Sequence, residues 1–194
     1  MATRATYTVK NNLTTTHLYI HWDGYLQGAA VYFYNALTEA KGGFAERMIR
    51  ANEGAELTSH FSHHGDTEFH YEIREDMTLT ASRWQSTAGL TRKLAAEYVG
   101  CIYEFVNQHV KGLDGFHEFR RVESKYGRAR WFNSVTAKAE LEGMGGALYH
   151  LRAWQANNIN KGSANWDYCV ADLKSITAVF PEIITPEISE FLAS

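Results

Sequence analysis

The clearest pattern in the chain is an alternation of two kinds of residue between positions 15 and 25. One set of alternating positions holds Leu18, Ile20 and Trp22, and the other holds His17, Tyr19 and His21. Successive side chains of a β-strand point to opposite faces, so this pattern predicts a strand with one apolar face. Asp23 and Gly24 follow with residues that favour turns. The rest of the chain is expected to pack in layers on the sheet that this strand joins.

Further alternating segments predict two β-hairpins. Residues 5–10 are expected to pair with residues 16–22, and residues 67–74 with residues 77–84. Residues 90–99 fit either a fifth strand or the start of a helix, and residues 56–66 fit a loop or an irregular edge strand. We therefore expect an α+β fold with an antiparallel sheet of about five strands, covered by helices on one face only.

Helical periodicity predicts the elements that cover the sheet. In the first part of the chain it marks residues 28–40, 44–52 and 101–110, and in the last third residues 135–157, residues 166–180 and a short helix after Thr185. Glycines within residues 143–146 predict a bend or a close backbone contact in the long helix. The expected organisation is a sheet domain over residues 1–134 and a helical region over residues 135–194 that packs on it as part of one domain.

Composition narrows the class of protein. The 194 residues are 45% hydrophobic, carry a formal net charge of −3, and include two cysteines without a CxxC spacing. The N-terminus has no apolar segment typical of a secretory signal, and no apolar run is long enough to span a membrane. These features predict a cytoplasmic protein with reduced thiols and a substantial core. The charge disfavours direct nucleic-acid binding, although basic residues between Arg120 and Arg130 leave a local basic patch open.

A histidine-rich stretch is the first candidate for chemistry. Its imidazole and carboxylate groups are those of His60, His63, His64 and Asp66, with His70 on the next strand. Such groups could bind a divalent transition metal such as Zn, and they then predict a metal-dependent hydrolase that uses the His60–His70 cluster. The spacing matches no known metal signature, so a solvated loop without any cofactor is the alternative that we favour.

The polar face of the predicted sheet is the second candidate. If the two hairpins pair, an imidazole and a carboxylate could meet there as a general acid–base couple. The residues concerned are His21, Asp23, His70 and Glu72. Ordinary cross-strand pairing is the preferred interpretation of this face. A ligand cavity lined by Tyr19, His21 and Tyr71 is a third alternative.

The aromatic content, 13% of the chain, exceeds what a core of this size requires. Aromatic rings beside arginines have the composition of a protein interface. The interface candidates are Trp22, Tyr25, Arg128, Arg130, Trp131 and Phe132.

Three stretches together carry a resemblance. HLYIHWDGYLQGAAVYFYNAL, GGFAERMIRANEGAELT and HGDTEFHYEI resemble a family of small uncharacterised proteins of phages, prophages and proteobacterial chromosomes. The resemblance covers about the first half of the chain and carries over no catalytic or binding residue. It implies an inhibitor of a bacterial defence system, similar to anti-CRISPR proteins, that acts by stoichiometric binding in the host cytoplasm. The expected partner is a host protein or ribonucleoprotein complex rather than a membrane, a homodimer is left open, and enzyme activity is not expected.

Overall fold

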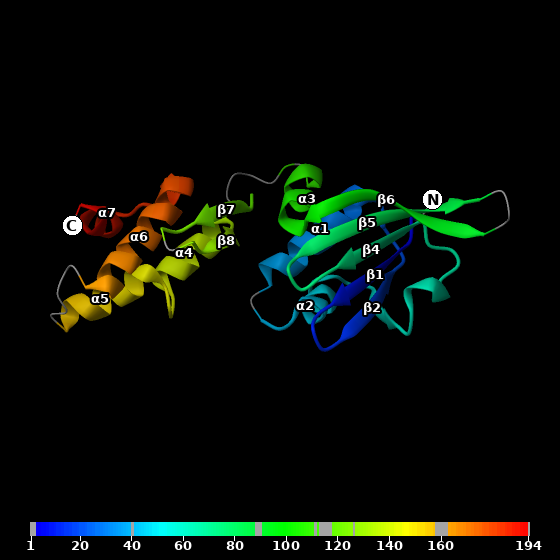
Figure 1. Cartoon of the computed structure of the whole chain (residues 1–194), viewed down its shortest axis with the longest axis horizontal. Helices are drawn as coiled ribbons and strands as arrows, with labels where there is room; N and C mark the ends of the chain where they lie inside the picture. The colour runs from blue at the N-terminus through cyan, green and yellow to red at the C-terminus, as the bar shows by residue number, and fades with distance from the viewer. Residues whose placement is uncertain are drawn as a thin grey trace. The chain divides into compact units, whose positions relative to one another are not determined.

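The computed structural model describes residues 3–39, 41–87, 91–110, 112, 118–125, 127–157 and 163–193. It divides the chain into two units, Met1–Lys111 and Gly112–Ser194. The first unit contains a sheet with three helices, and the second contains a short hairpin with four helices (Figure 1). Each unit is described by itself below.

Six strands form the sheet of the first unit. They are β1 (Ala5–Lys10), β2 (Thr15–Ile20), β3 (Ala55–Thr58), β4 (Phe69–Ile73), β5 (Thr78–Ser86) and β6 (Arg92–Cys101). Their order across the sheet is β3-β2-β1-β4-β5-β6. Both predicted hairpins are present as β1–β2 and β4–β5, and β3 and β6 occupy the two segments whose structure the sequence left open.

The prediction of a five-stranded, purely antiparallel sheet is wrong in two respects. The sheet has six strands, and it is mixed because β1 runs parallel to β4. The two hairpins pair through β1 and β4, which are the first strand of each hairpin. Between the two hairpins the chain passes through two helices and β3. Such a long crossover connection allows β4 to pair with β1 in the parallel direction.

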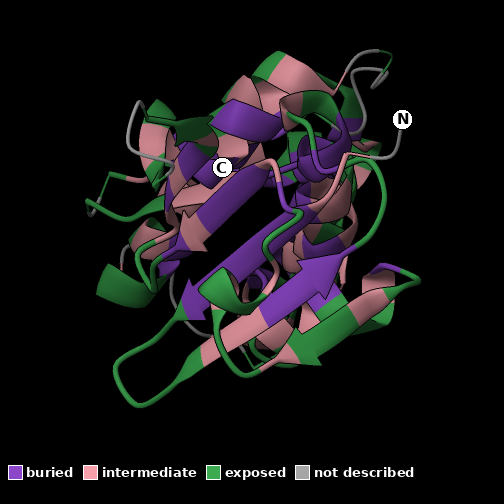
Figure 2. Cartoon of the chain, turned by 90° about the vertical axis from the view of Figure 1, so that its right-hand side faces the viewer, coloured by how far each residue is buried: buried purple, intermediate pink, exposed green. Residues whose placement is uncertain are grey.

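Three helices cover one face of this sheet, as predicted. They are α1 (Leu26–Thr38), α2 (Phe44–Ala51) and α3 (Ile102–His109). The core contains four packed rings, in which Tyr7 stacks on Tyr71 at 5.1 Å, and Phe33 meets both Tyr71 and Phe105 in edge-to-face contacts. Buried residues run along the inner strands of the sheet, and exposed residues lie on an outer strand (Figure 2).

The second unit combines a hairpin with helices around a separate core. Its elements are β7 (Arg120–Glu123), β8 (Ala129–Phe132), α4 (Ser134–Glu142), α5 (Ala147–Ala156), α6 (Ala164–Val179), the 3-10 turn η2 (Pro181–Ile183) and α7 (Pro186–Leu192). Val122 and Phe132 of the hairpin share this core with Leu141 and Leu173. The hairpin therefore belongs with the helices, and the division between the units falls at residue 111 rather than at the expected residue 134.

Glycines split the predicted long helix of residues 135–157 into α4 and α5. Gly145 has a φ of +94°, and a Cβ at Gly146 would lie 1.4 Å from the carbonyl oxygen of Glu140. The helix prediction is wrong as one element, but the close backbone contact that the glycines indicate is present. None of the helices within the described ranges has both the length and the apolar character that crossing a membrane would require.

Candidate functional site

The sheet face opposite the helices carries histidines on two strands. His17 of β2 and His70 of β4 each bind a threonine of β1, which lies between them. The Oγ1 atom of Thr8 lies 2.8 Å from Nδ1 of His17, and Oγ1 of Thr6 lies 3.0 Å from Nδ1 of His70. The sequence correctly assigns these polar residues to the face that the helices leave uncovered, but His70 is only 5% exposed there, which the sequence did not predict.

Residues 59–66 cover this face, and we call them the histidine loop. The loop contains the 3-10 turn η1 (Phe61–His63). His64 stacks on Tyr19 with the ring centroids 3.8 Å apart, and Phe61 stacks on His70 at 4.3 Å. The sequence missed this cover because the loop has no periodic pattern of its own.

Burial sets the charge of the two strand histidines. Desolvation lowers the pKa of His70 to about 4, and desolvation followed by the nearby His60 and Lys10 lowers the pKa of His17. His70 is therefore neutral at pH 7, which suits a ring that Phe61 covers.

The predicted metal ligands of the histidine loop point to different neighbours. Nδ1 of His60 lies 2.8 Å from Ser62, Nδ1 of His63 lies 2.8 Å from Ser59, Nε2 of His64 lies 3.0 Å from Thr58, and Asp66 forms an ion pair of 2.9 Å with Arg4. Within the described ranges, no three His, Cys, Asp or Glu side chains are grouped so that they could hold a metal ion. A metal at this loop remains a prediction from the sequence.

Three of the four residues named for acid–base chemistry contact groups outside this set. Nε2 of His21 lies 3.8 Å from Glu56, whereas Glu72 accepts a 2.7 Å hydrogen bond from Lys10. His70 is enclosed, and Asp23 faces a hollow described below.

The predicted cavity lined by Tyr19, His21 and Tyr71 is also wrong. Tyr71 pairs with Tyr7 on the helix-covered face, while Tyr19 pairs with Thr6 on the opposite face. Two residues on opposite faces of a sheet cannot line one cavity on either face.

The turn between β2 and α1 displays an exposed aromatic ring on a fixed backbone. Trp22 is 64% exposed and Tyr25 is 41% exposed. The backbone of this turn is held from three sides. Tyr32 donates a hydrogen bond of 3.0 Å to the carbonyl oxygen of Trp22, Tyr71 donates one of 2.8 Å to the carbonyl oxygen of Gly24, and the Gly24 N–H donates one of 2.8 Å to Thr3.

Two glycines allow this turn to pack closely. A Cβ at Gly24 would lie 2.7 Å from the Cβ of Ala5, and a Cβ at Gly28 would lie 2.0 Å from the carbonyl oxygen of Asp23. Asp23 itself has a φ of +50°, a left-handed conformation that aspartate tolerates better than most residues. Strained backbone of this kind is common at functional sites.

Beside the turn lies a hollow of about 410 Å³, which we call the Asp23 hollow. It is lined by Asp23, Tyr25, Gln27, Gly28, Val31, Tyr32, His109 and Val110. The sequence identified Asp23 as an acid–base candidate, Tyr25 as an interface candidate and Tyr32 as one of the aromatics that could not all be core, but it missed Val31 and His109. Helical spacing places Val31 and Tyr32 near the turn, whereas no sequence signal brings α3 and its His109 to the same place.

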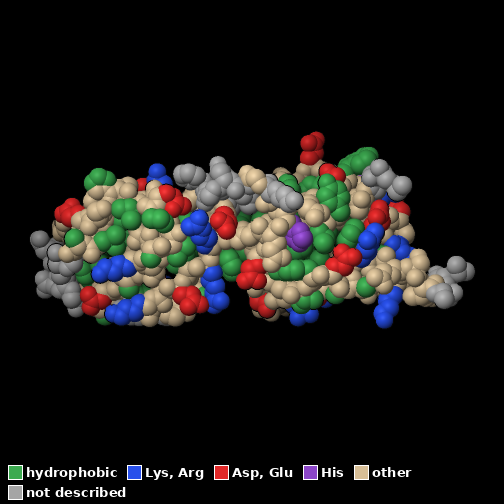
Figure 3. Space-filling model, turned by 90° about the horizontal axis from the view of Figure 1, so that it is seen from above, with side chains coloured by type: hydrophobic (Ala, Val, Ile, Leu, Met, Phe, Trp, Pro, Cys, Tyr) green, Lys and Arg blue, Asp and Glu red, His purple; other side chains and the backbone are tan. Residues whose placement is uncertain are grey.

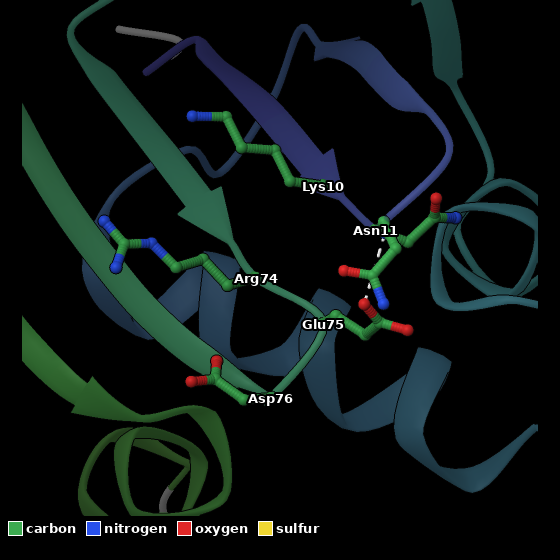
Figure 4. Close-up of a pocket in the computed structure, with 6 residues that line it drawn as sticks. Lys10, Asn11, Arg74, Glu75 and Asp76 are labelled. Carbon is green, nitrogen blue, oxygen red and sulfur yellow. Dashed lines mark hydrogen bonds between the residues drawn. The ribbon is translucent and has the colours of Figure 1, made fainter.

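Another hollow, of about 540 Å³, lies where the parallel strands β1 and β4 end (Figure 4). Its lining residues are Lys10, Asn11, Asn12, Arg74, Glu75 and Asp76. Lys10 and Arg74 both contact Glu72, and Glu75 accepts a 3.2 Å hydrogen bond from the N–H of Asn12. These charges are already paired within the chain, so we consider the Asp23 hollow the better candidate.

The interface candidates of the second unit are partly structural. Arg130 forms ion pairs with Glu140 at 2.8 Å and Asp172 at 3.5 Å, and Phe132 is 4% exposed. Trp131 is half-buried, and the exposed Arg128 lies over the ring of Tyr168 at 4.4 Å. Basic and acidic side chains are interspersed on the face drawn in Figure 3.

Comparisons with protein-family models, with curated proteins and with solved structures find no significant match to this chain. The functional argument therefore rests on the geometry of the site.

Proposed function

We propose that this chain is a protein-binding protein that acts stoichiometrically and contacts its partner through residues 21–25, the aromatic turn. The observation that carries the proposal is the 64% exposure of Trp22 on a backbone that three hydrogen bonds hold in place. Tryptophan is among the side chains most enriched at the interface positions that dominate binding energy.

The fixed backbone adds to the argument. Association loses affinity when flexible groups must become ordered, and a turn that is already ordered avoids that loss. Tyr71 is buried, and its hydrogen bond to Gly24 ties the turn to the centre of the sheet. The turn can therefore present Trp22 and Tyr25 to a partner without rearrangement.

The contact surface rests on the geometry above, whereas the partner class is taken from the resemblance described in the sequence analysis. Small phage-associated proteins of that sort are often inhibitors that act by stoichiometric binding. The proposed activity is the inhibition or modulation of a host protein or ribonucleoprotein complex, such as a defence complex, by one-to-one binding.

The test compares three versions of the full chain as baits in a host lysate. Trp22→Ala removes the proposed anchor, and Leu13→Ala is the matched control, because Leu13 is 93% exposed and precedes β2, at the opposite end of that strand from the turn. A dominant anchor contributes about 2 kcal/mol or more, which corresponds to a loss of about 30-fold in affinity. We expect one protein to be retained by the wild type and by Leu13→Ala and to be lost from Trp22→Ala.

The proposal fails if the Trp22→Ala bait retains the same proteins as the wild type. Circular dichroism and thermal unfolding of both variants confirm that a lost partner reflects the missing ring and not a lost fold.

A further inference from the structure

The Asp23 hollow combines an unpaired carboxylate with aromatic walls. The Asp23 side chain is exposed, and within the described part of the chain it forms neither an ion pair nor a hydrogen bond. Tyr25 and Tyr32 line the same hollow. Burial, followed by the nearby Asp23 and Tyr25, raises the pKa of Tyr32, which places these three groups close together.

We propose that this hollow binds the side chain of an arginine of the partner protein, with Asp23 as its counter-ion. The inference rests on the proposed function, since it names the chemistry of the partner at the same surface. A carboxylate can accept two parallel hydrogen bonds from a guanidinium group, and tyrosine rings attract a cation to their faces. The hydroxyl of Tyr32 donates to Trp22, so the lone pairs of its oxygen can accept a further N–H.

The remaining walls suit the aliphatic part of an arginine. Val31 is 43% exposed, and Gly28 has no side chain to obstruct entry. The volume of about 410 Å³ is larger than a single side chain requires, so the arginine can enter with some of its water. Arginine combines an apolar stem with a planar charged end, which matches this arrangement of surfaces better than a compact ammonium group.

The other titratable group of the hollow does not oppose a cation at neutral pH. Burial lowers the pKa of His109, and its ring lies 4.5 Å from that of Phe105 in the core. The imidazole is therefore uncharged, and Asp23 is the dominant charge of the hollow. A neutral apolar side chain in the same place would remove Asp23 from water without giving it a partner, and a carboxylate would be repelled.

The test is a nuclear magnetic resonance titration of the full ¹⁵N-labelled chain with N-acetyl-arginine amide. N-acetyl-citrulline amide is the matched control ligand, because it has nearly the same shape without the charge. Asp23→Asn removes the carboxylate while keeping a residue that tolerates the positive φ. Glu53→Gln is the matched control variant, since Glu53 is exposed between α2 and β3 and is not among the residues that line the hollow.

We expect the arginine derivative to shift the amide signals of Asp23, Tyr25 and Tyr32 and to saturate. The citrulline derivative should bind the wild type at least about tenfold more weakly than the arginine derivative does. The affinity of Asp23→Asn for the arginine derivative should fall by a similar factor, whereas Glu53→Gln should bind it as the wild type does. Four outcomes would each overturn the assignment. The citrulline derivative could bind as tightly as the arginine derivative, Asp23→Asn could bind arginine as well as the wild type does, the shifts could be confined to other residues, or N-acetyl-lysine amide could bind more tightly. The readout does not depend on the partner, so loss of the arginine site with retained Trp22-dependent capture would reject this inference and leave the proposed function standing.

Discussion

The hydroxyl of Tyr71 donates a hydrogen bond of 2.8 Å to the carbonyl oxygen of Gly24, and this bond joins the centre of the sheet to the aromatic turn. Tyr7 stacks on Tyr71 with an interplanar angle of 16°, yet its own hydroxyl is buried and has no hydrogen-bond partner among the described residues. The two stacked tyrosines thus differ in whether the buried hydroxyl has a hydrogen-bond partner.

Removal of the two hydroxyls should therefore change the free energy of unfolding differently. Tyr71→Phe leaves the buried Gly24 carbonyl without a partner and should reduce the free energy of unfolding by about 1–2 kcal/mol. Tyr7→Phe removes an unsatisfied polar group and should be neutral or slightly stabilising. Urea unfolding of the two variants measures both values, and an equal loss in both would show that the bond to Gly24 contributes nothing.

The turn between β4 and β5 contains a residue in an unfavourable conformation. Met77 has a φ of +63°, where a side chain costs about 1–2 kcal/mol, and glycine would cost about 0.5–1 kcal/mol through lost chain entropy. Because the Met77 side chain is also half-buried, the strain is isolated by comparing Met77→Gly with Met77→Ala, which both lose that side chain. Met77→Gly should have the higher free energy of unfolding of the two, by about 0.5 kcal/mol. Leu13→Gly, at an exposed turn residue without a positive φ, should be less stable than Leu13→Ala. A Met77→Gly variant less stable than Met77→Ala would contradict the expected relief of strain.

Burial of His70 predicts that the protein loses stability in mild acid. Its pKa is about 4 in the folded chain and about 6.5 in the unfolded chain, so between these values only the unfolded chain takes up the proton. The contribution of His70 is complete above pH 6.5 and falls by about 1.4 kcal/mol for each pH unit as the pH drops toward 4.

This pH dependence can be measured by urea unfolding at intervals from pH 7 to pH 5. His70→Asn should show a shallower dependence of the unfolding free energy on pH than the wild type, because it removes the buried imidazole of His70. Identical slopes in the two proteins would mean that His70 takes up its proton in the folded state as easily as in the unfolded one.

Arg92 should be more important for the histidine loop than its neighbour Lys93. The Arg92 guanidinium donates to the carbonyl oxygens of Gly65 and Thr67 and lies 4.8 Å above the ring of Trp84. Arg92→Gln should accelerate hydrogen exchange in residues 59–66 and cost about 1–2 kcal/mol of stability, since it removes charge-assisted hydrogen bonds. Lys93→Gln, at an exposed residue of the same strand, should change neither quantity. Unchanged exchange in Arg92→Gln would show that the other contacts of the loop hold it without Arg92.

Local pattern was sufficient to predict much of the secondary structure but not the topology. The hairpins, α2, α3 and the capping of α7 by Thr185 follow from alternation, periodicity and turn residues that lie close together in sequence. The parallel pairing of Ala5 with Phe69 depends on a contact across 64 residues, and no local signal records it. The glycines of residues 143–146 marked a special backbone, but their spacing did not show that it ends one helix and begins another.

The candidate site was predicted in a similar, partial way. Trp22 and Tyr25 were predicted to be interface residues because the chain has more aromatics than its core requires, and both are exposed. Sequence spacing does not reveal which way an imidazole points, and in the structure His60, His63 and His64 each face a different hydroxyl. His109 lines the Asp23 hollow because α3 packs near α1, a contact that the sequence does not predict.

The most direct test of the account is photocrosslinking in host cells with p-benzoylphenylalanine placed at position 22 and, as the matched control, at the exposed position 13 at the opposite end of β2. The account predicts one dominant crosslinked species of one-to-one stoichiometry from position 22 and none from position 13. Absence of a crosslink at position 22, or the same species from both positions, would contradict the claim that the turn carrying Trp22 is the surface that binds the partner.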